Sequence, residues 1–169
     1  MTLRRILIHP DPRLQTRCAP VTDIAAVRRL AEDMLETMYD APGVGLAAPQ
    51  VGETVRLFVM DCSPREAPPR PLVLVNPRVT WASEETNTHE EGCLSIPDVY
   101  EEVTRPARVR VAWQDLDGGA HEELFEGLWA TCAQHEIDHL DGRLFIDHLS
   151  PLKRRLITAK MKKLKRMRA

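Results

Sequence analysis

The sequence predicts an α+β fold with mostly antiparallel β-sheets and with helices near both ends of the chain. Apolar residues recur at helical spacing in residues 24–38, and short segments rich in β-forming residues follow in the middle of the chain. Helical spacing returns in residues 127–140 and 150–167. Because the strands follow one another without intervening helices, we expect them to pair antiparallel through hairpins.

The first expected helix covers residues 24–38, where the apolar side chains fall on one face. Thr22 or Asp23 is suited to be its N-cap. The helix is expected to end before Pro42, and a glycine-rich loop, Gly43–Gln50, follows it.

The strand-like segments lie between residues 55 and 125. They are residues 55–61, 72–75, 78–81, 100–104, 109–113 and 122–125. Asp117-Gly118-Gly119 predicts a hairpin turn before the last of them. Residues 62–71 contain four prolines, which favours a loop.

Two helices are expected in the C-terminal part of the chain. Leu128, Cys132, His135 and His139 are separated by four, three and four positions, so they share one face of the first helix. Ser150 followed by Pro151 is a typical start for the second helix, which is expected to run to about residue 167.

The length of 169 residues favours a single domain, residues 1–169, large enough to bury a core. The cysteines form no C-x-x-C pair, and we expect four free thiols: Cys18, Cys62, Cys93 and Cys132. No segment approaches the ~20 apolar residues needed to span a bilayer, and the N-terminus lacks a signal-peptide pattern. A cytoplasmic protein without membrane association is therefore expected.

Charge is distributed unevenly along the chain. Residues 152–169 carry nine basic residues and no acidic one, although the whole chain has a formal net charge of −2. A basic C-terminal helix on an acidic body indicates a polyanionic partner. The alternative is a solvated helix that packs one side on the body.

The strongest local pattern is H-E-x-x-H, formed by His135, Glu136 and His139. Residues four apart face the same way on a helix, so both imidazoles can reach one metal ion. Glu136 lies beside them, where its carboxylate can hold a metal-bound water. The alternative is a helix with two hydrogen-bonded core histidines and a surface glutamate.

A catalytic metal usually has three protein ligands and an open position. The third ligand could be a carboxylate or one of four side chains: His89, Cys93, His121 and His148. Cys93 stands out because Gly92 before it allows close backbone approach and because a thiolate suits a soft or borderline metal. A buried, inert thiol is an equal alternative at this point.

The glycine-rich loop is a third candidate element. Gly43 and Gly45 allow the backbone to pass close to a ligand, and the Gln50 amide could donate to an oxyanion. An ordinary turn between a helix and a strand explains the same residues.

Taken together and in this order, the three elements resemble the signature motifs of the peptide deformylases. The motifs are G-V-G-L-A-A-P-Q at residues 43–50, E-G-C-L-S at residues 91–95 and Q-H-E-I-D-H at residues 134–139. The resemblance extends over nearly the whole chain and is greatest to the bacterial class with a C-terminal helix. It implies antiparallel sheets packed around a helix that carries metal ligands.

The resemblance also implies roles for individual residues. Cys93, His135 and His139 would bind one divalent metal, usually Fe²⁺, although Zn²⁺, Ni²⁺ or Co²⁺ can take its place. Glu136 would be the general acid and base, and Gln50 with the backbone N–H of Leu94 would stabilise the oxyanion. The implied reaction removes the N-formyl group from the initiator methionine of a nascent chain and releases formate.

The methionine side chain needs an apolar pocket. Five residues are expected to bind substrate: Val44, Gly45, Glu91, Leu128 and Cys132. Arg105 is expected to form an ion pair with Glu91 beside Cys93. His89 and Tyr100 depart from the residues that relatives often carry near this pocket.

Under this interpretation the protein is a monomer, and its basic helix contacts the ribosome near the exit tunnel through ribosomal RNA. Two other functions stay open from the residues. One is an H-E-x-x-H metallopeptidase, because the same groups can hydrolyse peptide bonds. The other is a non-enzymatic, ribosome-associated protein with a structural metal.

Overall fold

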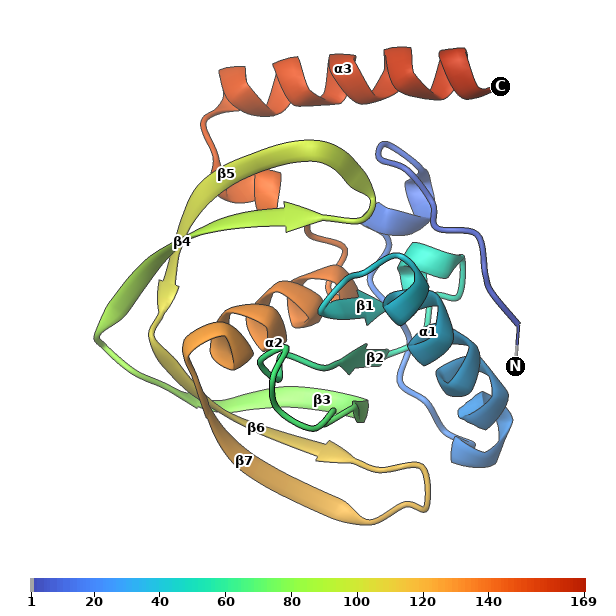
Figure 1. Cartoon of the computed structure of the whole chain (residues 1–169), viewed down its shortest axis with the longest axis vertical. Coiled ribbons are helices and arrows are strands. Elements are labelled where there is room, and N and C mark those ends of the chain that lie inside the picture. Colours follow the sequence, from blue (N-terminus) through green and yellow to red (C-terminus); the bar gives the residue numbers. More distant parts are fainter. Residues whose placement is uncertain (1) are drawn as a thin grey trace.

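The computed structural model describes residues 2–169, and their order of helices and strands is that of an α+β fold (Figure 1). The helices are α1 (Arg28–Asp40), α2 (Gly127–Leu140) and α3 (Pro151–Arg168), with short 3₁₀ turns at Pro12–Gln15, Ile24–Val27, Ala48–Val51 and Phe145–His148. The strands are β1 (Gly45–Ala47), β2 (Leu57–Met60), β3 (Leu72–Ala82), β4 (Thr86–Cys93), β5 (Ile96–Pro106), β6 (Arg108–Gln114) and β7 (Ala120–Glu126).

The strands form two antiparallel sheets, as the sequence predicts. One has five strands in the order β1-β2-β3-β6-β7, and the other pairs β4 with β5. The predicted hairpin turn joins β6 to β7, with Gly118 at a φ of 86°. The Asp115 carboxylate accepts hydrogen bonds from the N–H groups of Asp117 and Gly119 and so stabilises this turn.

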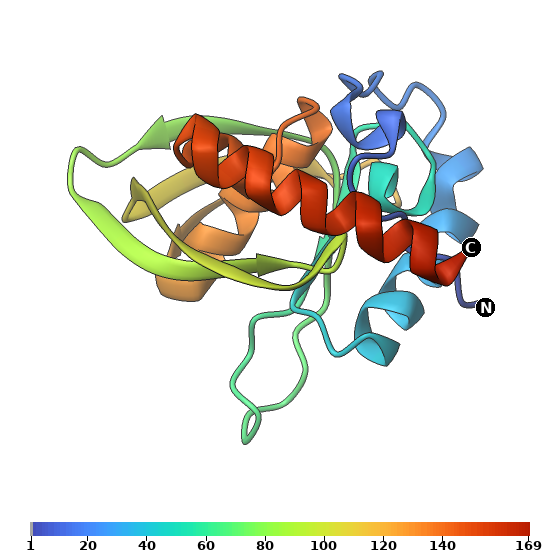
Figure 2. The same cartoon turned by 90° about the horizontal axis from the view of Figure 1, so that it is seen from above.

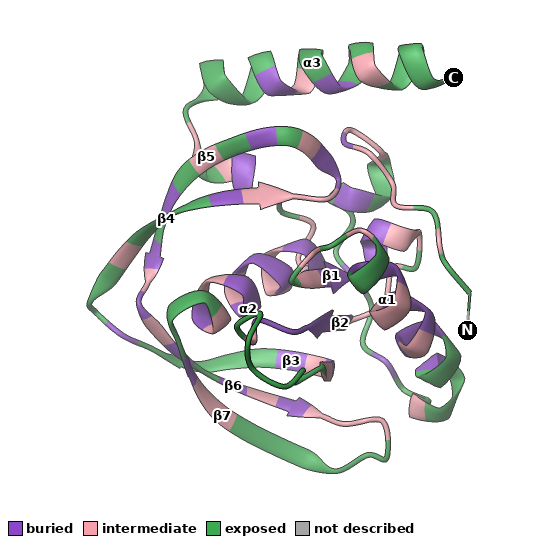
Figure 3. Cartoon of the chain, viewed as in Figure 1, coloured by how far each residue is buried: buried purple, intermediate pink, exposed green. Residues whose placement is uncertain are grey.

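Strand β2 is buried on both faces, which places it at the centre of the molecule. Phe58 and Met60 belong to a core cluster with residues of α2, whereas Leu57 and Val59 belong to a cluster with residues of α1. Since successive side chains of a strand point to opposite faces, α1 and α2 cover opposite sides of β2. Helix α2 therefore lies in the interior, where its polar residues are shielded from bulk water (Figure 3).

The predicted starting residue of the first helix is wrong. Residues 24–27 form a 3₁₀ turn, and the α-helix begins only at Arg28. Asp23 precedes the turn but makes no side-chain capping hydrogen bond, so nothing there favours the wider α-helical turn.

The predicted strands also differ from the observed ones. Residues 72–75 and 78–81 form the single strand β3, bent at Asn76 (φ 52°) and Pro77, where the pairing register with β6 shifts. The sequence did not indicate β1 or β4. Strand β4 has few β-forming apolar residues and exists because it pairs with β5 along its whole length.

The predicted loop at residues 62–71 and the predicted absence of disulfide bonds are both confirmed. Residues 62–71 form a loop that projects from the body (Figure 2). The four cysteines are free thiols. Within residues 2–169, none of the helices is long and apolar enough to cross a membrane.

Candidate metal centre and active site

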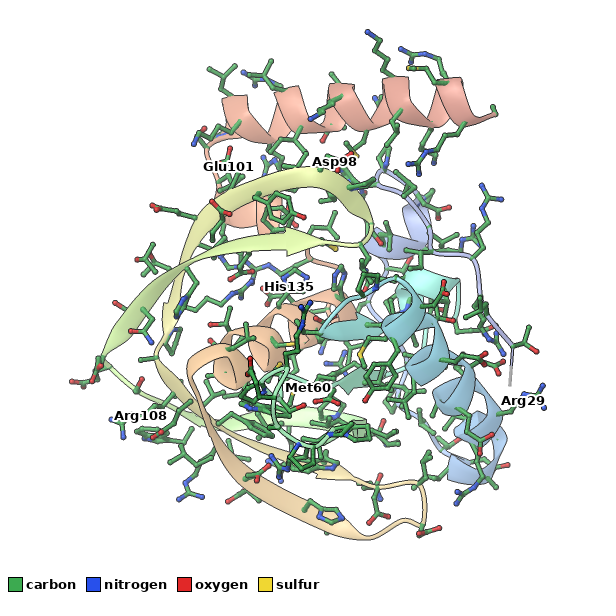
Figure 4. All side chains as sticks on the ribbon, in the orientation of Figure 1. Arg29, Met60, Asp98, Glu101, Arg108 and His135 are labelled. Atoms are coloured by element: carbon green, nitrogen blue, oxygen red, sulfur yellow. The ribbon has the colours of Figure 1, made fainter. Side chains whose placement is uncertain are left out.

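Helix α2 brings His135 and His139 to one side with their ring centroids 5.0 Å apart, and both side chains are buried. Cys93, the last residue of β4, lies opposite them, with its Sγ 3.4 Å from Nε2 of His139. One ligand atom from each of the three residues lies within 4.8 Å of the others. In Figure 4, His135 lies in the middle of the molecule, whereas Arg29 and Arg108 lie at its periphery.

This donor set fits a metal ion. A sulfur and two imidazole nitrogens that converge in a buried site suit Fe²⁺, Zn²⁺, Ni²⁺ or Co²⁺, and three ligands leave a coordination position for water or substrate. The residues around the three ligands also have the arrangement expected of a metal site, because one imidazole is held in place by a carboxylate.

That carboxylate belongs to Glu91. Nδ1 of His135 donates to Glu91 Oε1 at 3.0 Å, which leaves Nε2 of the ring as the ligand atom. Burial alone would raise the pKa of Glu91, but hydrogen bonds from His135 and Arg105 lower it to about 2. The carboxylate is therefore ionised at neutral pH.

The predicted ion pair between Glu91 and Arg105 is present. Nε and Nη2 of Arg105 lie 2.6 and 3.0 Å from the two Glu91 oxygens, and both side chains are buried. Both oxygens of Glu91 are thus engaged by protein donors, which favours a positioning role for Glu91 over the expected contact with substrate. Arg105 also donates to Asp138 at 2.9 Å, and His148 contacts the same Asp138 oxygen.

Replacing Arg105 by Ala is expected to weaken metal retention about 10–100-fold, the range usual for loss of such a supporting contact. Without Arg105, the buried Glu91 charge loses its partner and holds His135 less firmly. Metal content after dialysis against a chelator measures the effect. Arg108→Ala, which removes an arginine stacked on Trp81 at the surface, is the control. Equal metal content in both variants would contradict the role of Arg105.

Gln50 is 1% exposed, and its hydrogen bonds fix which way its amide oxygen and nitrogen point. Its Oε1 accepts from the Ala47 N–H at 2.9 Å, so Nε2 must point the other way, to Ser95 Oγ at 3.1 Å and Cys93 Sγ at 3.5 Å. The amide donor that the sequence suggested as an oxyanion partner therefore lies beside the metal ligands. Leu94 follows Cys93 in the turn between β4 and β5.

Glu136 is 3% exposed, and burial raises the pKa of its carboxyl to about 7. A group with such a pKa can both take and return a proton near neutral pH. Its Oε1 has no hydrogen-bond partner among residues 2–169, while Oε2 lies 3.7 Å from the Cys132 sulfur.

A cavity of about 490 Å³ opens beside these groups. Its walls include nearly all the residues expected from the sequence: Val44, Gly45, Gln50, Glu91, Cys93, Leu94, Leu128, Cys132, His135 and Glu136. Val44 and Leu128 are 43% and 51% exposed, so they present apolar surface at the mouth. His139 and Arg105 lie behind the wall.

His89 and Tyr100 line the same cavity. The Tyr100 ring lies against Gly92, where an added Cβ would come within 2.6 Å of it. The glycine before Cys93 is therefore needed for this close contact.

Sequence reasoning missed three polar contacts. Ser95, which is fully buried, orients Gln50, while Asp138 and His148 extend the hydrogen bonds of Arg105 to the surface. The available signal for Ser95 was its place at the end of the E-G-C-L-S motif, two residues after Cys93. The pairing of Asp138 with His148 depends on the turn Phe145–His148 and had no signal in the sequence.

The comparisons with known proteins agree with this arrangement. Residues 3–155 match the family model described as polypeptide deformylase. The chain is 52% identical over 174 residues to a peptide deformylase of Nitrobacter hamburgensis, covering 100% of this chain and 99% of that protein. It is 54% identical over 168 residues to one from Bradyrhizobium diazoefficiens, covering 96% and 97%.

Solved structures give the same result. A peptide deformylase from Legionella pneumophila superposes with a TM-score of 0.90 at 44% identity, covering 99% of this chain and 98% of that one. The enzyme from Ehrlichia chaffeensis in complex with actinonin superposes with a TM-score of 0.93 at 37% identity, covering 98% and 99%. By these relationships and by the site it carries, the chain belongs to the polypeptide deformylase family.

Proposed function

We propose that this protein hydrolyses the N-formyl group from the N-terminal formylmethionine of newly made polypeptides and releases formate. The observation that carries the proposal is the convergence of the ligand atoms of Cys93, His135 and His139 beside a cavity that Glu136 also lines, in a chain of the deformylase family. A metallopeptidase or a non-enzymatic metal protein has no such support from the family.

Cys93, His135 and His139 would hold one divalent ion, and Fe²⁺ is the ion we propose. When bound, such an ion lowers the pKa of water and polarises the formyl oxygen. Glu136 removes a proton from the attacking water and then returns it to the amine that leaves. Its Oε1, which has no hydrogen-bond partner in the described part of the chain, is the atom available for this transfer.

The oxyanion that develops on the formyl group needs hydrogen-bond donors. Gln50 Nε2 is directed to the site by the bond between its Oε1 and Ala47, and the Leu94 N–H lies next to Cys93 in the chain. Loss of one such donor typically costs about 2.7–4 kcal/mol of transition-state stabilisation. The apolar side chains of Val44 and Leu128 would contact the methionine side chain.

The proposed activity is tested by incubating anaerobically purified protein with a formyl-methionyl tripeptide and measuring both formate and product mass. Formate together with the intact peptide bearing a free amine is the expected result. Cleavage of an internal peptide bond would assign the protein to the peptidases instead. Absence of both products from protein with its metal bound would overturn the enzymatic proposal.

We also propose that the protein acts as a monomer in the cytoplasm and that α3 binds the ribosome near the exit tunnel. All nine basic residues of α3 are exposed, while Ile157 and Met161 are buried and attach the helix to the body (Figure 3). Because removal of residues 153–169 would uncover that buried cluster, charge substitutions test the proposal better than truncation.

Exchanging three α3 charges for Gln is expected to weaken ribosome binding without changing turnover of a formyl peptide. The variant carries Lys160→Gln, Lys163→Gln and Arg166→Gln, and a control carries Arg65→Gln, Arg78→Gln and Arg110→Gln on other exposed surfaces. Phosphate contacts release counterions, so binding by the wild type should also fall steeply with salt. Co-sedimentation with ribosomes measures both effects. Equal, salt-insensitive binding by all three proteins would refute the role of α3.

A further inference from the structure

Cys132 lies one helical turn before Glu136 on α2, so the two side chains share a face. The Cys132 sulfur is 3.7 Å from Oε2 of Glu136 and 3.7 Å from the carbonyl oxygen of Val44. Its side chain is 5% exposed. The sulfur is therefore in hydrogen-bonding range of the proposed general base and not merely part of an apolar wall.

Strand β1 confines this pair from the other side. A Cβ added at Gly45 would come within 2.6 Å of both the Cys132 sulfur and Glu136 Oε2. The Gly45 backbone thus packs directly against the two groups. Within this enclosure Oε2 has the thiol as a neighbour, whereas Oε1 has no partner among the described residues.

The thiol is a donor in this setting. The neighbouring Cys62 thiol, burial and the Glu136 carboxylate raise the pKa of Cys132 well above that of a free thiol, so the sulfur keeps its proton. An S–H group is a weak donor, and a carboxylate oxygen is a hydrogen-bond acceptor. The two groups are therefore complementary.

We propose that Cys132 is a positioning residue, whose S–H holds Oε2 of Glu136 and leaves Oε1 free for proton transfer. The inference rests on the proposed role of Glu136 as the base. It assigns to Cys132 a different task from the binding of a methionine side chain, which would need only the apolar surface of the thiol.

Kinetics distinguish the two roles. Removal of the donor in Cys132→Ala is expected to lower kcat about threefold to tenfold while KM for a short formyl peptide changes less than twofold, because the base and not the substrate loses a contact. Cys132→Ser keeps a donor and should recover most of kcat. Cys18→Ala, which removes another buried thiol of the same core cluster, should leave kcat unchanged.

Other kinetic outcomes would overturn the proposal. If Cys132→Ala and Cys132→Ser lower kcat equally, the role of Cys132 is packing alone. If both keep the wild-type kcat, the thiol has no role in turnover. If the principal change is in KM, Cys132 serves the pocket, as the sequence analysis expected.

An infrared measurement tests the hydrogen bond directly and does not depend on catalytic activity. The S–H stretch of Cys132 is identified as the band that the wild-type spectrum contains and the spectrum of Cys132→Ser lacks. In Glu136→Ala this band is expected to move to higher frequency, because a stronger acceptor has been removed. An unmoved band would overturn the proposal even if the protein releases formate, and a moved band would support it even if the protein does not.

Discussion

Replacing Glu136 by Gln is expected to remove nearly all formate release while the protein keeps its metal. The amide has nearly the shape of the carboxylate but cannot take a proton from water, and positioned proton transfer typically contributes about 10²–10⁴-fold to a rate. The metal should stay bound because Glu136 is not among the three residues whose ligand atoms converge. The measurements are kcat for a formyl-methionyl tripeptide and metal content per chain.

A matched control is available in α1. Glu36 is also a helical glutamate, and one of its carboxylate oxygens is buried without a hydrogen-bond partner among residues 2–169, but it lies outside the cavity. Glu36→Gln should therefore retain full turnover. A near-normal rate for Glu136→Gln would show that another group carries the proton, and loss of metal together with activity would assign Glu136 a structural task.

The parts of the site that come from a single helix were predictable from the sequence. Helical geometry puts residues four apart on one face, so the arrangement of His135, Glu136 and His139 follows from their spacing. The burial of the helix, which raises the pKa of Glu136, could not be predicted from the helix sequence alone because it depends on the rest of the fold. That burial depends on strands of both sheets, which come from distant parts of the sequence.

The parts that depend on pairing between strands were not predictable in the same way. Cys93 reaches the two histidines because β4 pairs with β5 and ends in the turn where Cys93 opposes Ile96. The residues of β4 do not alternate between apolar and polar, so the strand itself left no periodic signal. Spacing alone therefore left Cys93 as one candidate among several, and the joint presence of three family motifs singled it out.

The Glu91–Arg105 pair illustrates an intermediate case. The two residues were expected to pair, and their side chains meet across β4 and β5 although the strand register places Glu91 opposite Glu101 and Arg105 opposite Asn87. Their further contacts to His135 and Asp138 connect the β-sheet to the helix and could not be read from either segment alone. The network shows how the small sheet and α2 are held together at the site.

Replacing Gly45 by Ala is expected to lower kcat about 100-fold, which is typical of a displacement of about 1 Å at a reacting group. The new methyl group would fall 2.6 Å from Glu136 Oε2 and from the Cys132 sulfur, a distance that real side chains do not tolerate. The carboxylate is the more mobile of the two neighbours, so the clash is relieved by moving the base away from its working position. The metal ligands are not touched, and metal content should be unchanged.

The control for this substitution is Gly119→Ala in the β6–β7 hairpin. There the added Cβ would come within 2.8 Å of an Asp115 carboxylate oxygen, so the steric conflict is of the same kind but lies far from the cavity. Both variants should lose a similar, modest amount of thermal stability, and only Gly45→Ala should lose turnover. If Gly45→Ala keeps the wild-type kcat, the carboxylate can function from a second position, and the confinement of Glu136 by β1 and Cys132 is not what determines the rate.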